Sequence, residues 1–312
     1  MVFHTFRGRR NAREALKGLK RENGNSGMVS LKPVPIEKIM EVEAKTLGIE
    51  AREAKRRVKE YRGYIDLFVD NVLREHGRSL WLTEKGEAAT LAGIVGTLYG
   101  SMNAEFKDHS KIIEAIRDGG FNCYSSTIVV SDVMVRLGIP VGIAAVPGHV
   151  LPHTNRHLVE TTAEWEDAVR PVSMLNIEYT LVYRTGVEGL LGIAWNNYGM
   201  VLAGKGMAGE AVKAYDEALS IIPEHAGFMF NKGSLLAGEG LQSEALAVYR
   251  NLLRGDAAGP NIWQRISIGA FLLGDIEGAL NACEMAVEEN PHDKVARQIR
   301  DLLLTVVEND GR

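Results

Sequence analysis

The chain is poor in the features that mark secreted, membrane and nucleic-acid-binding proteins. It has 2 cysteines in 312 residues, and its formal net charge is -4. Two cysteines in different regions do not form the disulfide framework of a small secreted domain. No apolar run reaches the roughly 18 residues of a membrane helix, and a slightly acidic balance disfavours general nucleic-acid binding. We therefore expect a cytoplasmic, globular protein of two domains with no membrane span and no nucleic-acid partner.

The first segment of the chain is basic. Its cationic residues are Arg7, Arg9, Arg10, Arg13, Lys17, Lys20 and Arg21. A basic amphipathic helix could meet an acidic surface or a membrane. The simpler interpretation, which we prefer, is a solvated or disordered arm over residues 1–34, because Gly24 to Gly27 interrupt the segment.

A cysteine, a histidine and a carboxylate follow one another in the middle of the chain, at Cys123, His149 and Glu160. In that order they are the parts of a nucleophile, its base and an orienting acid. Apolar residues at helical spacing over 127–137 predict a helix that begins at Cys123 and ends at Gly138. Cys123 then lies in the first turn of this helix, where unpaired N–H groups and the helix dipole lower the pKa of a thiol.

The histidine and the glutamate are expected on neighbouring strands. Residues 141–146 are apolar and β-prone, residues 154–156 are typical of a hairpin tip, and residues 157–161 form the returning strand. Measured back from the tip, His149 and Glu160 lie at similar depth. The carboxylate could therefore accept a hydrogen bond from the far nitrogen of the ring and fix its tautomer.

These residues resemble the transglutaminase-like domains, which share the papain arrangement of a helix-borne cysteine and two sheet-borne partners. In that family the cysteine helix ends in a Leu-Gly-Ile-Pro phrase, as at 137–140 here, and the histidine opens a strand, matching His149. The family's acid is usually aspartate in an Asp-Pro-Thr phrase, matched by Glu160 and the two threonines after it. The resemblance covers roughly residues 90 to 165. Glutamate replaces aspartate, and the hairpin between His149 and Glu160 is short.

The resemblance implies an α+β transglutaminase-like domain, which we place at residues 35–184, with thioester chemistry at Cys123 and no cofactor. Helices are expected at 36–47, 51–76, 84–102 and 110–117, beside the small sheet. The oxyanion donors would be the backbone N–H of Cys123 and a side chain upstream, either Asn122 or Asn103.

Other interpretations of the same residues stay open. A buried cysteine is usually a small apolar side chain, and Glu160 could be an ordinary strand carboxylate. His153 and His157 compete with His149 for the role of base. The three histidines would share a face on a helix, as in zinc sites, but Pro152 and the hairpin tip disfavour a helix, so no metal site is expected.

Residues 185–312 repeat with a period of 34 residues. The period aligns an apolar set (Trp195, Met229, Trp263), a glycine set (Gly206, Gly240, Gly274), an alanine set (Ala211, Ala245, Ala279) and a set that ends the unit (Pro223, Ala257, Pro291). This pattern is the tetratricopeptide (TPR) signature and predicts an all-α TPR solenoid of three repeats with a capping helix over 293–307. Gly199 and Ala211 would let paired helices approach, and Trp195 and Tyr215 would fill the space between them. Cys283 aligns with Tyr215 and Tyr249, so it belongs to the core of the repeats.

The sequence supports three hypotheses of function. The first is a cysteine-dependent amide or peptide hydrolase, or an acyl transferase, with repeats that bind a partner. The alternative is a catalytically silent transglutaminase-like fold that serves as an adaptor, and the third is a TPR adaptor whose first domain is only structural. The groove of the repeats would take a protein or peptide ligand and would present Asn197, Asn231 and Lys232.

Overall fold

The computed structural model describes residues 29–76, 84–102, 104–107, 111–146, 149–162, 167–174, 183–223, 225–254, 260–272, 274–289 and 294–310. The chain divides into two compact units, Met1–Leu191 and Gly192–Arg312. Most of the basic arm predicted at 1–34 lies outside the described residues, as do Asn103 and Pro291.

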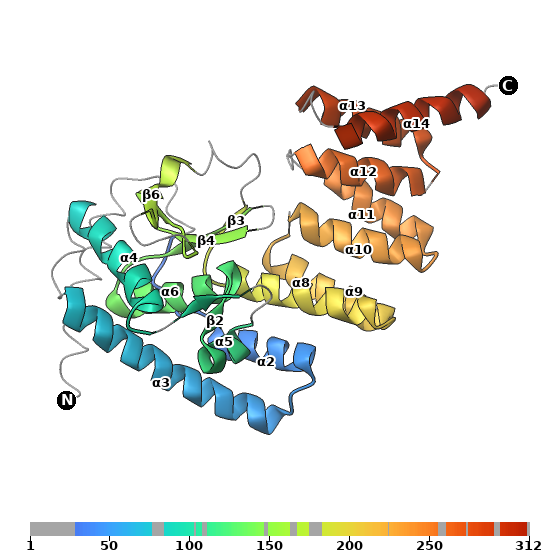
Figure 1. The fold of residues 1–312 in the computed structure, drawn as a ribbon. Coiled ribbons are helices and arrows are strands. Elements are labelled where there is room, and N and C mark those ends of the chain that lie inside the picture. Colours follow the sequence, from blue (N-terminus) through green and yellow to red (C-terminus); the bar gives the residue numbers. More distant parts are fainter. Residues whose placement is uncertain are drawn as a thin grey trace. The chain divides into compact units, whose positions relative to one another are not determined.

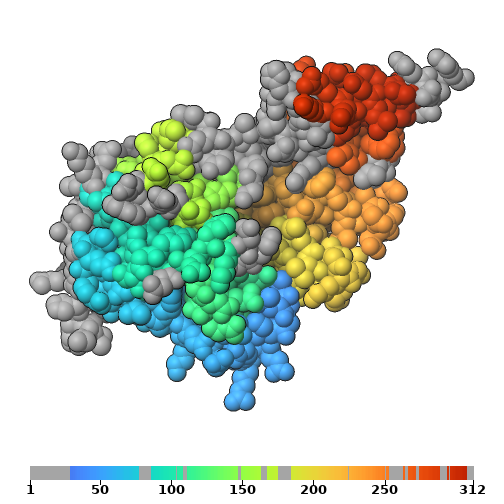
Figure 2. All heavy atoms as spheres, viewed as in Figure 1, coloured from blue at the N-terminus to red at the C-terminus, as the bar shows by residue number. Residues whose placement is uncertain are grey.

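In the described part of the first unit, α6 (Cys123–Leu137) packs against α3 (Ala51–His76), α4 (Glu84–Tyr99) and α5 (Ile112–Asp118). Helix α2 (Ile36–Leu47) packs against α3 and α5. The bounds of α2 and α3 agree with the sequence prediction, whereas α4 ends before the predicted residue 102. Figures 1 and 2 show α3 along the outside with α5 beside it, where Arg57 donates to the carbonyl of Ile113.

A polar cap fixes the start of α6 at Cys123. The Oδ1 of Asn122 accepts the N–H groups of Tyr124 at 3.1 Å and Ser125 at 3.0 Å. The Oγ of Ser125 accepts the N–H of Asn122 in return, which completes a capping box. Gly138 ends the helix in the left-handed region, at φ 82°. Cys123 is therefore the first residue of a helix whose termini are both well defined.

Five short antiparallel strands form the sheet of the first unit. They are β3 (Gly142–Val146), β4 (His149–His153), β5 (His157–Val159), β6 (Val169–Pro171) and β7 (Tyr183–Thr185). Their order is β6-β5-β4-β3-β7. Helix α6 packs against β4, and α4 packs against β5 and β6 (Figure 1). Strands β1 (Glu105–Phe106) and β2 (Gly120–Phe121) form a separate parallel pair. Strand β2 leads directly into the cap of α6.

Because alternate side chains of a strand point to the same face of the sheet, one face of each strand can be buried and form a core. Ala144, Leu151 and Leu158 come from β3, β4 and β5, and each is fully buried. The apolar run that predicted a strand at 141–146 is β3 in the structure. The predicted hairpin is formed by β4 and β5, with Thr154 donating its N–H to the carbonyl of His157. The described part of the first unit therefore combines helices with an antiparallel sheet.

The second unit is a series of antiparallel helix pairs followed by a final helix. The pairs are α8 (Gly189–Gly204) with α9 (Ala208–Ile221), α10 (Ala226–Gly238) with α11 (Gln242–Arg254), and α12 (Pro260–Leu272) with α13 (Ile276–Glu289); the last helix is α14 (Lys294–Asp310). The glycines at 206, 240 and 274 all have positive φ, at 73°, 77° and 75°. Each sits in the turn between paired helices, where its missing side chain permits this conformation.

Close packing explains why glycine recurs at the same position in the first helix of the first two pairs. A Cβ on Gly199 would lie 2.7 Å from the ring of Tyr215, and one on Gly233 would lie 2.7 Å from the ring of Tyr249. Tyr215 is buried with Ala211, and Trp195 packs against them. The roles predicted for Gly199, Ala211, Trp195 and Tyr215 are thus confirmed.

Cys283 occupies the core of the last helix pair, as the alignment of the repeats predicted. It is fully buried, and its sulfur lies 2.9 Å from the Oγ of Ser267. Burial raises the pKa of this thiol. Among the described residues, no helix is both long and apolar enough to cross a membrane.

Candidate active site

The centre of the candidate site is a bond between His149 and Glu160. The Nε2 of His149 lies 2.9 Å and 2.8 Å from the two carboxylate oxygens of Glu160. His149 is the first residue of β4, and Glu160 follows the end of β5. The antiparallel pairing of these strands brings the two side chains together. Because a carboxylate only accepts, Nε2 is the donor, and Nδ1 is the ring nitrogen left to face another group.

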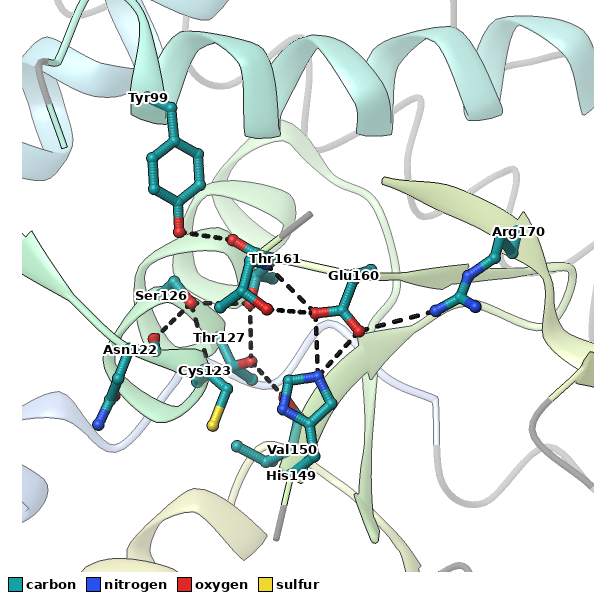
Figure 3. Close-up of polar contacts among 11 residues, drawn as sticks. Tyr99, Asn122, Cys123, Ser126, Thr127, His149, Val150, Glu160, Thr161 and Arg170 are labelled. Atoms are coloured by element: carbon teal, nitrogen blue, oxygen red, sulfur yellow. Dashed lines mark hydrogen bonds and ion pairs between the residues drawn. The ribbon is translucent and has the colours of Figure 1, made fainter. Parts of the chain in front are cut away.

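Cys123 lies beside this pair at the start of α6 (Figure 3). Cys123 is partly buried, and its side chain helps to raise the pKa of His149. The side chains of His149 and Glu160 are 20% and 12% exposed. The three residues predicted from the sequence therefore lie in one place, and the histidine and the carboxylate are partly shielded from water, which strengthens their electrostatic interaction.

The surroundings of the pair favour its charged form. Burial alone would lower the pKa of His149, but hydrogen bonds with Cys123 and Glu160 outweigh it and raise that pKa to about 9. Burial acts on Glu160 in the opposite sense, yet its bonds with His149 and Thr162 lower the pKa of the carboxyl. At neutral pH the imidazolium and the carboxylate are both stabilised.

His153 and His157 are occupied elsewhere. His153 is 3% exposed and donates from Nδ1 to the carbonyl of Thr154 at 2.9 Å, and burial lowers its pKa. His157 has its own carboxylate, Glu87, at 3.0 Å from Nδ1. Of the three histidines, only His149 is paired with Cys123 and Glu160. Within the described part of the chain, no group of three or more histidine, cysteine or acidic side chains could hold a metal ion.

The sequence analysis missed several groups that hold Glu160. Thr162 donates to its Oε1 from the hydroxyl at 2.7 Å and from the backbone at 3.2 Å. The guanidinium of Arg170, on β6, lies 3.6 Å from Oε2. Thr162 could have been suspected from its position two residues after the acid, since Ser and Thr often bond the chain locally. Arg170 carried no signal because only the sheet brings β6 next to Glu160.

Of the groups predicted to donate hydrogen bonds to an oxyanion, those at the start of α6 are described by the structure. The backbone N–H of Cys123 belongs to the first turn of α6, where N–H groups have no partner within the helix. Asn122 uses its side-chain oxygen to cap that helix, which fixes the amide next to Cys123. Asn103, the other predicted donor, lies outside the described residues.

The residues predicted to bind a partner lie on the first helices of two repeats. Asn197 is exposed on α8. Asn231, on α10, donates to the Oδ1 of Asn196 at 2.9 Å and so links two repeats. The ammonium of Lys232 is 2.6 Å from Asp216 of α9. Asn197 also accepts from the Nδ2 of Asn196 at 3.5 Å, so all three predicted residues have bonds within the unit.

Comparison with known proteins supports the repeats. A family model described as tetratricopeptide repeat matches residues 193–225. No curated protein matches the chain. The matched segment is the first helix pair with its aligned Trp195, Gly199 and Tyr215, so the presence of a TPR unit is shown.

Three solved structures illustrate the likeness. The Sgt2 TPR domain from Aspergillus fumigatus is 20% identical at a TM-score of 0.35, over 39% of this chain and 82% of that one. The first TPR of Spaghetti (RPAP3), bound to the HSP90 peptide SRMEEVD, is 15% identical at 0.34, over 38% and 93%. YrrB, a TPR protein with an unusual peptide-binding site, is 22% identical at 0.32, over 36% and 58%. Since these TM-scores are low, the solenoid assignment depends on the family match and the helix pairs.

Proposed function

We propose that this chain is a cysteine-dependent amide or peptide hydrolase or acyl transferase of the transglutaminase-like class. The observation that carries the proposal is the bond of both Glu160 oxygens to the Nε2 of His149, with Cys123 beside this pair at the start of α6. This is the arrangement of a nucleophile, a base and an orienting acid. The domain from about residue 35 to 184 would house it.

The proposed reaction starts with the sulfur of Cys123 as a thiolate and His149 as an imidazolium. The sulfur attacks the carbonyl carbon of an amide, and the carbonyl oxygen becomes an oxyanion near the N–H of Cys123. When the C–N bond breaks, His149 gives its proton to the leaving amine and a thioester remains. Water or a second amine then attacks the thioester while His149 takes its proton. The C–S bond breaks, which releases the acid or the new amide and regenerates the thiolate and the imidazolium.

Glu160 acts on His149 throughout this cycle. By accepting from Nε2, it holds Nδ1 toward the sulfur and stabilises the positive ring. Thr162 and Arg170 hold the carboxylate in turn. Their contacts keep Glu160 from rotating away when the charge on the ring changes.

Labelling with an activity-based thiol probe tests the proposal. The unchanged chain should be labelled at Cys123, and His149→Ala should slow labelling strongly at neutral pH. Cys123→Ala is the control for labelling elsewhere, since Cys283 is buried. Equal labelling of the unchanged chain and His149→Ala would reject the enzyme and leave the catalytically silent adaptor.

We further propose that the repeats bind a protein or peptide. The first helices of the first and third pairs expose apolar side chains: Met200 on α8 is 52% exposed, and Ile268 and Phe271 on α12 are 41% and 39% exposed. A mixture of amide and apolar groups suits an extended peptide, which offers both backbone polar groups and side chains. Lys232 would contact a ligand only after releasing Asp216.

A peptide selected from a display library against the full chain would test this second role. Asn197→Ala together with Asn231→Ala should weaken its binding, and Cys123→Ala should leave it unchanged. The fragment 187–312 should also fold alone as a helical unit, because each repeat packs mainly on its neighbours. An unfolded fragment would instead make the repeats a structural support.

A further inference from the structure

The face of α6 that carries Cys123 also carries two buried hydroxyls. Ser126 and Thr127 stand at i+3 and i+4 from Cys123, so they lie one turn along on the same side of the helix. Both residues are 0% exposed. Hydroxyls with no access to water need partners inside the protein, so the contacts of these two show what this face is built to hold.

Each hydroxyl is tied to a chain neighbour of a site residue (Figure 3). Thr127 donates to the carbonyl of Val150 at 3.0 Å, and Val150 directly follows His149. The Oγ of Ser126 lies 2.7 Å from the Oγ1 of Thr161, which directly follows Glu160. The helix of the cysteine is thus fastened to the base and to the acid at adjacent positions.

The direction of these bonds leaves Thr161 as a donor. Ser126 uses its single proton on the carbonyl of Asn122 at 2.6 Å, and Thr127 uses its proton on Val150. The proton of Thr161 therefore points to Ser126, or to Thr127 at 3.5 Å. The backbone carbonyl of Thr161 also accepts the hydroxyl of Tyr99 at 2.7 Å. A valine of the same shape would fill the space but could not make the bond.

We propose that Thr161, Ser126 and Thr127 are positioning residues that set the distance between the thiol of Cys123 and the His149–Glu160 pair. This inference rests on the proposed function. The two hydroxyl contacts cross from α6 to β4 and to the end of β5, where apolar packing alone would allow sliding. A thiol and an imidazole that share a proton need their spacing held to a fraction of an ångström.

The pH dependence of Cys123 alkylation by iodoacetamide in the full chain tests the inference. In Thr161→Val the rate at neutral pH should fall about tenfold, and the profile of rate against pH should differ from that of the unchanged chain, because the thiol and the imidazole lose their fixed spacing. Thr161→Ser keeps the hydroxyl and should restore most of the rate. Thr46→Val is the matched control, because it removes a buried hydroxyl bonded at 2.9 Å to Val42 within α2; its profile should not change.

An unchanged pH profile in folded Thr161→Val overturns the inference, and so does an equal shift in Thr46→Val. If Thr161→Val does not fold, Thr127→Val gives the same readout through Val150, and an unchanged profile there also overturns it. Failure of the proposed function looks different: His149→Ala would then leave the profile of the otherwise unchanged chain as it was.

Discussion

Glu160 binds the Nε2 of His149 with both carboxylate oxygens, at 2.9 Å and 2.8 Å. This contact selects one histidine from the three on the hairpin, since His157 faces Glu87 and His153 faces the carbonyl of Thr154. Together with Cys123, it raises the pKa of His149 against the effect of burial, because a negative group at the far side of the ring stabilises the imidazolium.

The two cysteines should differ in reactivity. Cys123 is partly buried and lies beside His149, whereas Cys283 is fully buried and bonded to Ser267, where burial raises its pKa. At neutral pH we expect iodoacetamide to modify Cys123 at least about tenfold faster than Cys283. Peptide mapping of the folded chain after timed exposure measures both rates. Equal or reversed rates would contradict an activated thiol at Cys123.

The three histidines should separate in the same assay. His149→Ala should slow alkylation of Cys123 near neutral pH by roughly tenfold or more, because the thiolate loses its cationic partner. His153→Ala and His157→Ala should change the rate by less than about twofold, and they serve as controls from the same hairpin. A larger effect from His157→Ala would identify His157 as the base.

Glu160→Gln should change the pH range of the site. Without the carboxylate, the pKa of His149 should fall from about 9 toward its ordinary 6.5. In the unchanged chain the stabilisation from this raised pKa is complete below 6.5 and is lost as pH rises through about 9. The NMR titration of the His149 ring in both proteins measures the shift, and alkylation should be slowed less than by His149→Ala. An unchanged titration would show that Glu160 does not set the charge of the ring.

Glu43 should make the fold less stable as pH rises. It is 3% exposed and accepts the N–H groups of Ile112 at 3.2 Å and Ile113 at 2.9 Å. Burial raises its pKa from 4.5 to about 7. Since the folded state keeps the proton longer, the free energy of unfolding should fall between pH 4.5 and about 7, by on the order of 3 kcal/mol.

Urea unfolding at pH 5 and pH 8 measures this effect. Glu43→Gln cannot ionise, so the difference between the two pH values should shrink in that variant. Glu41→Gln is the control, because Glu41 lies at an exposed position of the same helix, α2. The same pH dependence in Glu43→Gln as in the unchanged chain would assign it to other groups.

Two glycines of α8 should respond oppositely to alanine. A Cβ on Gly199 would meet the ring of Tyr215 at 2.7 Å, while one on Gly204 meets nothing within 4 Å. Gly199→Ala should therefore destabilise the repeats by about 1–3 kcal/mol through overpacking. Gly204→Ala should be neutral or stabilise them by up to about 1 kcal/mol. Thermal melting followed by circular dichroism compares the two, and equal melting temperatures would contradict tight packing at Gly199.

Several parts of the molecule could be predicted from the sequence because they depend on contacts close in the chain. The 34-residue period predicted the helix pairs, since Gly199 meets Tyr215 and Gly233 meets Tyr249 in the next helix of the chain. The start of α6 and the hairpin of β4 and β5 are also local, because capping and turn geometry involve only a few residues. These elements were enough to bring Cys123, His149 and Glu160 into one hypothesis.

The remaining features were decided by the tertiary structure. The sequence left His153 and His157 as competitors of His149, and only the placement of Glu87 on α4 gave His157 another carboxylate. Likewise Arg170 reaches Glu160 only through the pairing of β5 with β6, and Thr161 reaches Ser126 only because α6 packs against the sheet. Lys232 was predicted for the groove, yet its ammonium lies on Asp216 of the preceding repeat. When two bonded or oppositely charged groups are this far apart in the chain, their contact depends on how the helices and strands pack. Local sequence patterns do not predict that packing.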